Sequence, residues 1–246
     1  MTAGVPIFSP GASEDLLSGG RSLRRALAEQ PYHMVERDAV IVAADDRDPP
    51  VVQIHRGMAY RSFTLADGRR AIVDILIPGD IVGVDHAVLG RANHDIVATG
   101  RMGYRALSAA TARELMTDPQ IAIRALALIG EARWRADRHI TAITRLDAHG
   151  RIGAFLLGIY ERLRRRDLIA RPTFNLPLTQ EQMADHLGMT MVHISRTLRR
   201  MREERLVLVD RQVVIILDLE GLRQVVTGLP PLTAADARMQ PQDSMN

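Results

Sequence analysis

The spacing of hydrophobic residues changes along the chain, and it predicts different structures in successive segments. At 13–29, Leu16, Leu17, Leu23 and Leu27 are spaced for one face of a helix. Residues 1–12 have no such periodicity. We therefore interpret residues 1–30 as a loose, disordered start followed by one helix.

From residue 31 to 117 the pattern changes to short β-rich runs separated by turn-forming stretches. The turn-forming stretches are DDRDPP, ADGRR, IPGD and LGRAN. The β-rich runs are AVIVAA, PVVQIH, AYRSFTL, RRAIVDILI, HDIVATG and GYRALS. Several short strands at this spacing predict an antiparallel sandwich or barrel. The step Asp67-Gly68 is typical of a hairpin turn, because glycine tolerates a positive φ.

A long segment at 118–146 is apolar on two faces of one predicted helix. One apolar row alternates spacings of four and three residues, as a coiled-coil seam does. It consists of Ala122, Leu126, Ile129, Arg133, Ala136, Ile140 and Ile143, with Arg133 as its one polar member. A second row is expected to pack on the β-rich region, and it consists of Ile121, Ala125, Leu128 and Ala132.

The alternative interpretation of 118–146 is one helix of an ordinary core. Its two apolar faces, between a β-rich region and a helical one, favour a dimerisation helix instead. After the residues DAHG, a further helix is predicted that ends in YERLRRRD.

The stretch LTQEQMADHLGMTMVHISRTLRRMREERL predicts two helices with a sharp turn between them. Thr179 followed by Gln182 is a capping-box pattern, so the first helix should begin at Gln180. Gly188 is suited to end that helix in a left-handed conformation. Thr190 is suited to cap the second helix. The turn is then about three residues long, as a helix-turn-helix requires.

The second helix combines an apolar stripe of Ile194, Leu198 and Met201 with five arginines. If its N-terminal part enters a major groove, its exposed residues meet base edges. Arg196 is best suited to this, since a guanidinium can donate two hydrogen bonds to O6 and N7 of guanine. The later arginines are suited to phosphates. The predicted DNA-binding set is Thr179, Gln180, Thr190, Met191, Val192, His193, Ser195, Arg196, Arg199 and Arg200.

The alternative interpretation of this basic helix is a solvated surface. Three features weigh against it: the spacing of the two caps, the apolar stripe, and the following runs in LVLVDRQVVIIL, which predict a β-hairpin wing. His193 fits a DNA contact and a plain surface position equally well. Residues 229–246 have turn formers and no periodicity, which predicts a mobile tail.

Composition and charge then narrow the classes of protein. The chain has 246 residues, of which 46% are hydrophobic, so a globular protein of one or two domains is expected. It contains no cysteine, which excludes disulfides, cysteine-ligated zinc and iron–sulfur clusters. All 32 basic residues are arginine, yet the net charge is only +3, so any nucleic-acid surface must be local.

Several other classes of protein are not supported by the sequence. No apolar run approaches the roughly 20 residues of a membrane span, and the first residues lack the layout of a signal peptide. We therefore expect a cytoplasmic protein with no membrane partner. No nucleophile–base pairing or metal-ligand spacing indicates an enzyme.

Residues 32–219 together resemble the Crp/Fnr family of bacterial transcription regulators. The most specific motifs are LTQEQMADHLGMT, ISRTLRRMREERLV and DGRRAIVDILIPGDIVG. The resemblance implies an α+β fold with a jelly-roll-like antiparallel β-barrel sensor domain at 31–117, a dimerisation helix at 118–146 and a winged helix-turn-helix at 147–228. It also implies a homodimer that reads a palindromic, two-fold symmetric operator through the helix 190–202 and contacts RNA polymerase.

The recognition helix departs from the family pattern. Family members often carry Ser/Thr-Arg-Glu-Thr-Val-Ser-Arg, whereas this chain reads TMVHISR at 190–196. The Ser-Arg end is kept, but Met191 and Val192 replace the Arg-Glu pair. Loss of the glutamate removes an acceptor for the amino group of cytosine, so we predict a different half-site, with contacts to thymine methyl groups.

The β-rich region also departs from the relatives that bind cyclic nucleotides. Those relatives carry Gly-Glu-Leu and, farther on, Arg-Ser or Arg-Thr. This chain has Val84 after Gly83, and Arg91 is followed by Ala92. Cyclic AMP is therefore not expected as the effector, and no cofactor is predicted.

Other effectors stay open as alternatives. His55, His86 and His94 raise haem as one of them, although a lone histidine is more often a surface or hydrogen-bonded residue. A small apolar effector, a protein partner and control by expression level alone fit equally well. A further alternative is a signalling protein that senses a small ligand and whose DNA binding is secondary.

Overall fold

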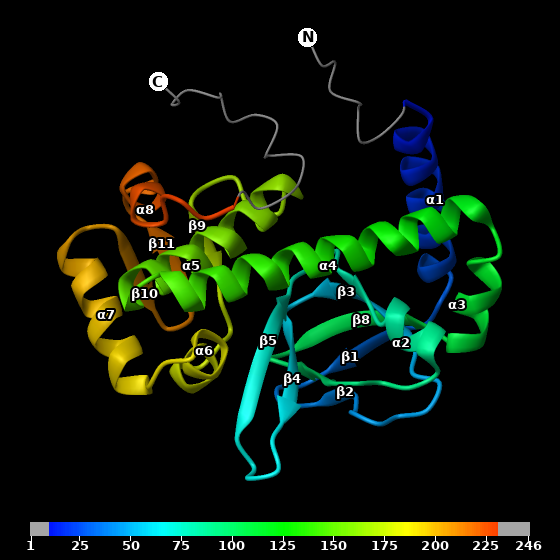
Figure 1. Ribbon diagram of the computed structural model, residues 1–246, viewed down its shortest axis with the longest axis horizontal. Coiled ribbons are helices and arrows are strands. Elements are labelled where there is room, and N and C mark those ends of the chain that lie inside the picture. The colour runs from blue at the N-terminus through cyan, green and yellow to red at the C-terminus, as the bar shows by residue number, and fades with distance from the viewer. Residues whose placement is uncertain (1–9, 231–246) are drawn as a thin grey trace.

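The computed structural model describes the backbone of residues 10–230 and the side chains of residues 18–230 (Figure 1). Helix α1 (Pro10–Ala28) begins three residues earlier than predicted, so residues 10–12 are helical. Leu23 and Leu27 of α1 are buried, as their spacing predicted. The predictions for residues 1–9, for the side chains of Leu16 and Leu17, and for 231–246 lie outside the described part.

Residues 32–107 form two four-stranded antiparallel sheets, so the predicted antiparallel β architecture is confirmed; residues 32–117 are called the β-domain below. The first sheet, in the order β1-β8-β3-β6, contains β1 (Tyr32–Val35), β3 (Val51–Arg56), β6 (Ile81–Val82) and β8 (Met102–Leu107). The second, in the order β2-β7-β4-β5, contains β2 (Val40–Val42), β4 (Ala59–Thr64), β5 (Arg70–Leu76) and β7 (Asp95–Ala98). All six predicted runs hold a strand.

The sheets enclose apolar side chains that include Val52, Ile54, Leu76, Ile96 and Met102. The predicted hairpin between β4 and β5 is also confirmed: Thr64 pairs with Arg70, and Gly68 has a φ of 82°.

Sequence patterns did not predict four short elements of the β-domain. Strand β1 is mostly exposed and β6 has two residues, so neither has a usable alternation of apolar positions. The other two are helices of six and seven residues, α2 (Val84–Leu89) and α3 (Ala109–Leu115). Such helices span about two turns, too few for a recognisable apolar stripe.

Helix α4 (Pro119–Arg145) crosses the β-domain, and α5 (Ala148–Arg165) runs back beside it (Figure 1). The Asp118 carboxylate accepts a hydrogen bond from the Gln120 amide at 2.8 Å, which starts α4 at the predicted position. Helix α5 begins three residues earlier than predicted, because Asp147 caps it through the Gly150 amide.

The second apolar row of the long helix was predicted to pack on the β-rich region, and this packing is confirmed. Ala125 and Leu128 of this row share a hydrophobic cluster with Val51 and Leu107 of the β-domain. Leu27 of α1 belongs to the same cluster. Helix α1 therefore fills the space beside α4 and the first sheet.

The C-terminal region folds as helices around a small antiparallel sheet in the order β10-β11-β9. Its elements are β9 (Thr173–Asn175), α6 (Gln180–Leu187), α7 (Met191–Glu203), β10 (Val207–Asp210), β11 (Val213–Ile216) and α8 (Leu219–Val225). The predicted β10–β11 hairpin is confirmed, and it is called the wing below. Strand β9 and helix α8 are short elements that no sequence pattern predicted.

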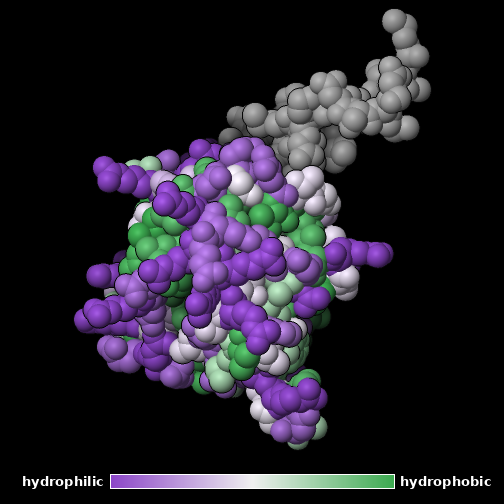
Figure 2. Space-filling view, turned by 90° about the vertical axis from the view of Figure 1, so that its left-hand side faces the viewer, coloured by the Kyte–Doolittle hydropathy of each residue, from purple (hydrophilic) through white to green (hydrophobic). Residues whose placement is uncertain are grey.

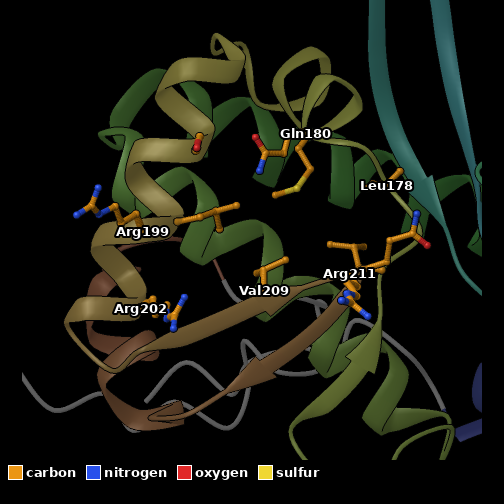
Figure 3. Close-up of a pocket in the computed structure, with 11 residues that line it drawn as sticks. Leu178, Gln180, Arg199, Arg202, Val209 and Arg211 are labelled. Carbon is orange, nitrogen blue, oxygen red and sulfur yellow. The ribbon is translucent and has the colours of Figure 1, made fainter.

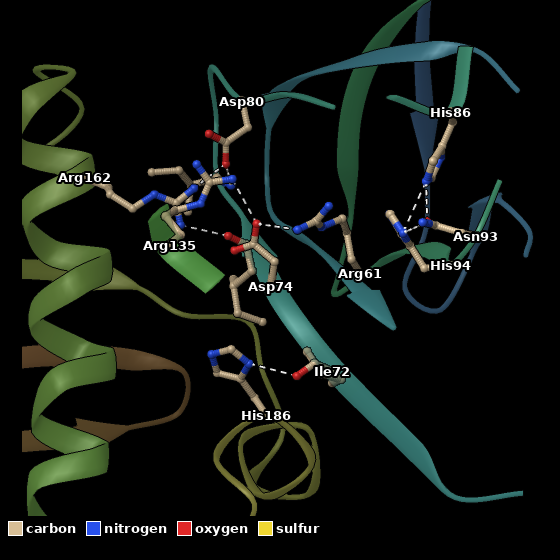
Figure 4. A network of polar contacts seen from close by, with 12 residues as sticks. Arg61, Ile72, Asp74, Asp80, His86, Asn93, His94, Arg135, Arg162 and His186 are labelled. Atoms are coloured by element: carbon tan, nitrogen blue, oxygen red, sulfur yellow. Dashed lines mark hydrogen bonds and ion pairs between the residues drawn. The ribbon is translucent and has the colours of Figure 1, made fainter. Parts of the chain in front are cut away.

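A buried ionic network joins the β-domain to α4 and α5 (Figure 4). Asp74 of β5 accepts from Arg135 of α4 at 2.9 Å and from Arg61 of β4 at 3.3 Å. Asp80 pairs with Arg162 of α5 and with Arg166, which lies 2.7 Å away. Burial raises the pKa of both aspartates, but the surrounding guanidiniums outweigh burial and hold each pKa below its ordinary value.

A second junction joins α6 to strand β5. The imidazole of His186 lies 3.0 Å from the Ile72 carbonyl and stacks on His139 of α4, with ring centroids 4.2 Å apart. Beside it, Arg70 donates two hydrogen bonds to Asp185, at 2.7 and 2.8 Å. The first helix of the helix-turn-helix is thus docked against the β-domain.

We predict that the free energy of unfolding decreases as the pH falls from 6.5 toward about 4. Burial, and then the neighbouring His139, lowers the pKa of His186 from 6.5 to about 4. Within that window the unfolded chain binds more protons than the folded chain, so stability rises with pH. Urea unfolding across the window measures the effect. The buried carboxylates add their own loss mainly at lower pH, because their ordinary pKa is 3.8.

Two variants test whether the buried imidazole of His186 causes this pH dependence. His186→Asn retains a donor for the Ile72 carbonyl and should show a smaller decrease in stability with acid. His33→Asn changes an exposed histidine of β1 and should keep the wild-type pH dependence. An unchanged pH dependence in His186→Asn would mean that the His186 imidazole is not the cause.

Candidate nucleic-acid interface

The helix pair α6–α7 is built by caps within a few residues of sequence. The Thr179 hydroxyl accepts from the Gln182 amide at 3.0 Å, and the Gln182 side chain accepts from the Thr179 amide at 2.9 Å, which confirms the capping box. Gly188 ends α6 with a φ of 61°. The Thr190 hydroxyl accepts from the His193 amide at 3.2 Å and starts α7. The positions predicted for both caps and for the turn are confirmed.

The buried face of α7 differs from the predicted stripe by one residue. Ile194, Thr197 and Met201 are buried, whereas Leu198 is only half-buried. Leu198 lies one position farther around the helix, where it lines a cleft between α7 and the wing. Hydrophobicity alone favoured leucine over threonine at this face. Packing instead placed the small, β-branched Thr197 inside.

The opposite face of α7 projects into solvent. Met191 and Val192 are 54% and 65% exposed, and His193, Ser195 and Arg196 are exposed beside them. Apolar side chains this exposed at a helix N-terminus have no packing role within the described chain. They are therefore available for a partner.

The prediction that the second helix carries five arginines is wrong by one. Helix α7 ends at Glu203, so Arg205 lies beyond it, with a left-handed φ of 58°. The other four arginines belong to α7, and all four are exposed. Hydrophilic residues cover much of the face of the molecule that Figure 2 shows.

The arginines of α7 differ in their partners. Arg199 pairs with Glu203 at 3.0 Å, and Arg200 pairs with Glu204 at 2.7 Å. Glu204 also lies 2.8 Å from His149 of α5, so Arg200 is held toward α5. The side chains of Arg196 and Arg202 have no hydrogen-bond or ion-pair partner within residues 18–230. Exposed ion pairs such as Arg199–Glu203 contribute about 0–1 kcal/mol to stability. A phosphate can therefore replace the glutamate as the partner of Arg199 at little cost in free energy.

The wing closes a cleft of about 300 Å³ against α7, called the wing cleft (Figure 3). Its polar lining comes from the N-terminus of α6, from α7 and from the wing tip, and includes Gln180, Ser195, Arg199, Arg202, Arg211 and Gln212. Arg211 and Gln212 form the tip, with left-handed φ values of 43° and 71°. Such values at both central residues are those of a type I′ turn.

Arg211 is a basic residue that our DNA-binding set omitted. Its sequence signal was the arginine at the turn of the predicted hairpin. That signal is weak without the structure, because only the folding of the wing places Arg211 in the same cleft as Arg199 and Arg202 (Figure 3).

The predicted DNA-binding residues fall into three groups. Gln180, Ser195 and Arg199 line the wing cleft. Met191, Val192, His193 and Arg196 occupy the exposed N-terminal part of α7. In the third group, the Thr179 and Thr190 hydroxyls already accept cap hydrogen bonds, and Arg200 pairs with Glu204.

A second outward surface is the heptad row of α4, called the α4 seam. Leu126, Ile129 and Ile140 are 68%, 40% and 53% exposed. Ala122, Ala136 and Ile143 are half-buried, and Arg133 pairs with Asp137 on the same helix. An apolar row this exposed marks an interaction surface.

The stretch from Gly83 to Arg91, where this chain departs from the cyclic-nucleotide-binding relatives, lies beside a second cleft. A cleft of about 220 Å³, called the β-domain cleft, lies between Gly83, Val84 and Asp85 on one side and α4 on the other. Arg61, Arg133 and Arg135 also line it. Arg91 pairs with Asp45 at 2.8 Å, and both side chains are more than half exposed.

The histidines considered for haem lie in two places. His86 and His94 contact each other, with ring centroids 4.2 Å apart. His55 instead lies against Tyr32. No helix within residues 10–230 is both long and apolar enough to cross a membrane.

Comparisons with known proteins agree with this architecture. The family model of the Crp-like helix-turn-helix domain matches residues 150–225. The nitrogen fixation regulation protein FixK of Rhizobium meliloti is 30% identical over 186 residues, which cover 75% of this chain and 82% of FixK. The transcriptional activator protein FnrL of Cereibacter sphaeroides is 27% identical over 198 residues, 78% of each chain.

Solved structures show the same fold. The structure of FixK2 from Bradyrhizobium japonicum matches with a TM-score of 0.73 at 22% identity, and the match covers 82% of this chain and 99% of FixK2. The structure of a CooA mutant from Carboxydothermus hydrogenoformans matches with a TM-score of 0.63 at 17% identity, over 82% of this chain and 90% of CooA.

Proposed function

The chain belongs to the Crp/Fnr family of bacterial transcription regulators, and on that premise we propose that it acts as a homodimer on a two-fold symmetric operator. Family membership makes it a DNA-binding transcription regulator and not an enzyme. One observation carries the proposal: the chain exposes both a recognition helix, α7, and an apolar heptad seam on α4.

The α4 seam supports the dimer. Burial of apolar surface contributes roughly 25 cal/mol per Å², so Leu126, Ile129 and Ile140 favour contact with a second apolar surface. A seam with alternating spacings of four and three residues fits a second copy of itself around a two-fold axis. Arg133, its polar member, keeps a partner on its own helix at 2.8 Å.

In the proposed complex, the N-terminal part of each α7 enters a major groove, and the two grooves lie about 34 Å apart. Arg196 is unpartnered within residues 18–230 and is assigned to a guanine. Met191 and Val192 are assigned to thymine methyl groups. Arg199, Arg202 and Arg211, which meet in the wing cleft, are assigned to phosphates.

We also propose that cyclic AMP is not the effector. Val84 lacks an acceptor for a ribose hydroxyl, and Arg91 is followed by Ala92 where the cyclic-nucleotide-binding relatives carry Ser or Thr. We assign a small-ligand effector to the β-domain cleft. Arg133 and Arg135 of α4 line this cleft, so a ligand bound there would contact α4 directly. Contact with RNA polymerase and a cytoplasmic location are proposed from family membership.

We predict that Arg196→Ala weakens binding to the specific operator by about 1–3 kcal/mol and barely changes nonspecific binding. The operator is first obtained by selecting genomic fragments on the purified protein, and affinities are then measured by fluorescence anisotropy at several salt concentrations. If no fragment shows salt-sensitive binding, the proposed function is wrong.

Two arginine variants serve as controls for that measurement. Arg199→Ala should weaken binding to all sequences and reduce the salt slope by about one, as loss of a phosphate contact does. Arg25→Ala removes an exposed arginine of α1 and should change neither affinity. Equal losses on specific and nonspecific DNA in Arg196→Ala would make Arg196 a phosphate contact.

We predict that the double variant Leu126→Glu/Ile140→Glu is monomeric at concentrations where the wild type is dimeric. In a two-fold symmetric dimer, the glutamates of the two copies would face each other across the seam. Their like charges repel and their carboxylates lose hydration, so association is disfavoured. Sedimentation velocity measures the mass, and anisotropy should show operator binding lost with it. Leu65→Glu, in the hairpin between β4 and β5, is the control, because Leu65 is 45% exposed and this hairpin lies at the end of the β-domain opposite α4 (Figure 1). A dimeric seam variant would show that the interface lies elsewhere.

We predict that titration with cyclic AMP gives no saturable heat. This chain has Val84 and Ala92 where the cyclic-nucleotide-binding relatives carry a glutamate and a Ser or Thr. Isothermal titration calorimetry of the purified protein is the measurement. Saturable micromolar binding that is abolished in Arg91→Ala would contradict the prediction.

A further inference from the structure

Three polar side chains converge inside the β-domain, apart from both clefts and from the α4 seam (Figure 4). His86 Nε2 lies 2.8 Å from Asn93 Oδ1 and 3.2 Å from His94 Nδ1. His94 Nδ1 also contacts Asn93 Oδ1, which closes a triangle of three heteroatoms. Helix α2 supplies His86, and the turn before β7 supplies the other two.

This triangle cannot be satisfied by hydrogen bonds alone when both histidines are neutral. If both ring nitrogens carry protons toward Asn93 Oδ1, the two protons face each other across the 3.2 Å nitrogen–nitrogen contact. If only one nitrogen is protonated, the other presents a lone pair to the lone pairs of Oδ1. Turning the Asn93 amide lets it donate to both rings, but it leaves two nitrogen lone pairs in contact.

The other nitrogen of each imidazole ring makes no hydrogen bond that could offset the unfavourable contacts within the triangle. His86 Nδ1 and His94 Nε2 are buried without a hydrogen-bond partner in the described part of the chain. The His86 and His94 side chains are 0% and 3% exposed. A buried polar group that lacks a partner costs about 1–3 kcal/mol, so these outer nitrogens do not offset the unfavourable contacts within the triangle.

We propose that His86 Nε2, His94 Nδ1 and Asn93 Oδ1 bind a divalent transition-metal ion of the zinc class. A cation at the apex of the triangle accepts all three inward lone pairs at once. Donors that share such an ion at about 2.1 Å lie roughly 3 to 3.4 Å apart. His86 Nε2 lies 2.8 and 3.2 Å from the other two donors, whereas His94 Nδ1 and Asn93 Oδ1 lie closer together and must separate when the ion binds. Two imidazoles and one amide oxygen suit zinc, nickel or cobalt better than calcium or magnesium.

The surroundings allow an ion to enter but do not suit a large ligand. Asn93 is exposed, so the triangle opens to solvent on that side and water can fill the remaining coordination positions. Neither the wing cleft nor the β-domain cleft is lined by His86 or His94, and Phe63 packs against His94. Among the described residues no group of three His, Cys, Asp or Glu side chains could hold a metal, which makes the Asn93 amide the necessary third donor.

Direct metal binding to the full-length protein tests the proposal. Metal-stripped, untagged wild type is dialysed against Zn²⁺, and separately against Co²⁺ with visible absorption as a readout of nitrogen ligation. We expect one ion per chain. Asn93→Ala, at an exposed position, should fold normally and bind at least about tenfold more weakly, a loss that even partners outside the coordination sphere can cause.

The double variant His86→Gln/His94→Gln should lose the bound ion, with circular dichroism checking that it folds. His33→Gln/His55→Gln removes two other histidines of the β-domain and should bind as the wild type does. Wild-type affinity in Asn93→Ala, loss of the ion in the control alone, or no stoichiometric ion in the wild type would overturn the site. The readout needs no DNA, so its failure is distinct from failure of the proposed operator binding.

Discussion

The buried ionic network around Asp74 and Asp80 is the interaction on which the arrangement of the chain depends. Arginines from β4, α4 and α5 converge on two carboxylates of the β-domain, whose side chains are at most 10% exposed. Removing one partner of a buried pair typically costs 3–5 kcal/mol, because a charge is then left without compensation. The β-domain, the long helix and the start of the C-terminal region are therefore held at one point, and a shift of α4 against the β-domain must rearrange these contacts.

The same constraint decides which surfaces stay free. Helix α6 is docked on β5 through His186 and through the Arg70–Asp185 pair, so the inner side of the helix pair is occupied. What projects outward is the N-terminal part of α7, the wing cleft and the α4 seam. Because α4 carries both the seam and Arg135, a change at a dimer interface and a change in the ionic network act on the same helix. Under the proposed function, this continuity is the physical basis for coupling the β-domain to DNA reading.

Sequence patterns predicted the features that depend on residues close together in the chain, and they missed features that depend on distant residues. Caps at Thr179, Gly188 and Thr190 were predicted because each satisfies backbone groups within four residues. Longer-range packing overrode simple hydrophobicity at Leu198, which faces the wing cleft while Thr197 is buried. Very short elements such as β6 and β9 form only by pairing with strands elsewhere in the chain, so their own residues carry little signal.

By itself the sequence determined the order of the β-rich region, the long helix and the helix-turn-helix, together with the heptad row and the family, because local periodicity, caps and motifs encode each of them. Only the tertiary structure decided how distant side chains meet. Asp74 and Arg135 are 61 residues apart, and Arg70 and Asp185 are 115 apart. Arg211 enters the cleft of α7 through the fold of the wing, and His86 reaches His94 through the turn between α2 and β7. Such contacts depend on the path of the backbone in space, which no local pattern of residue types records.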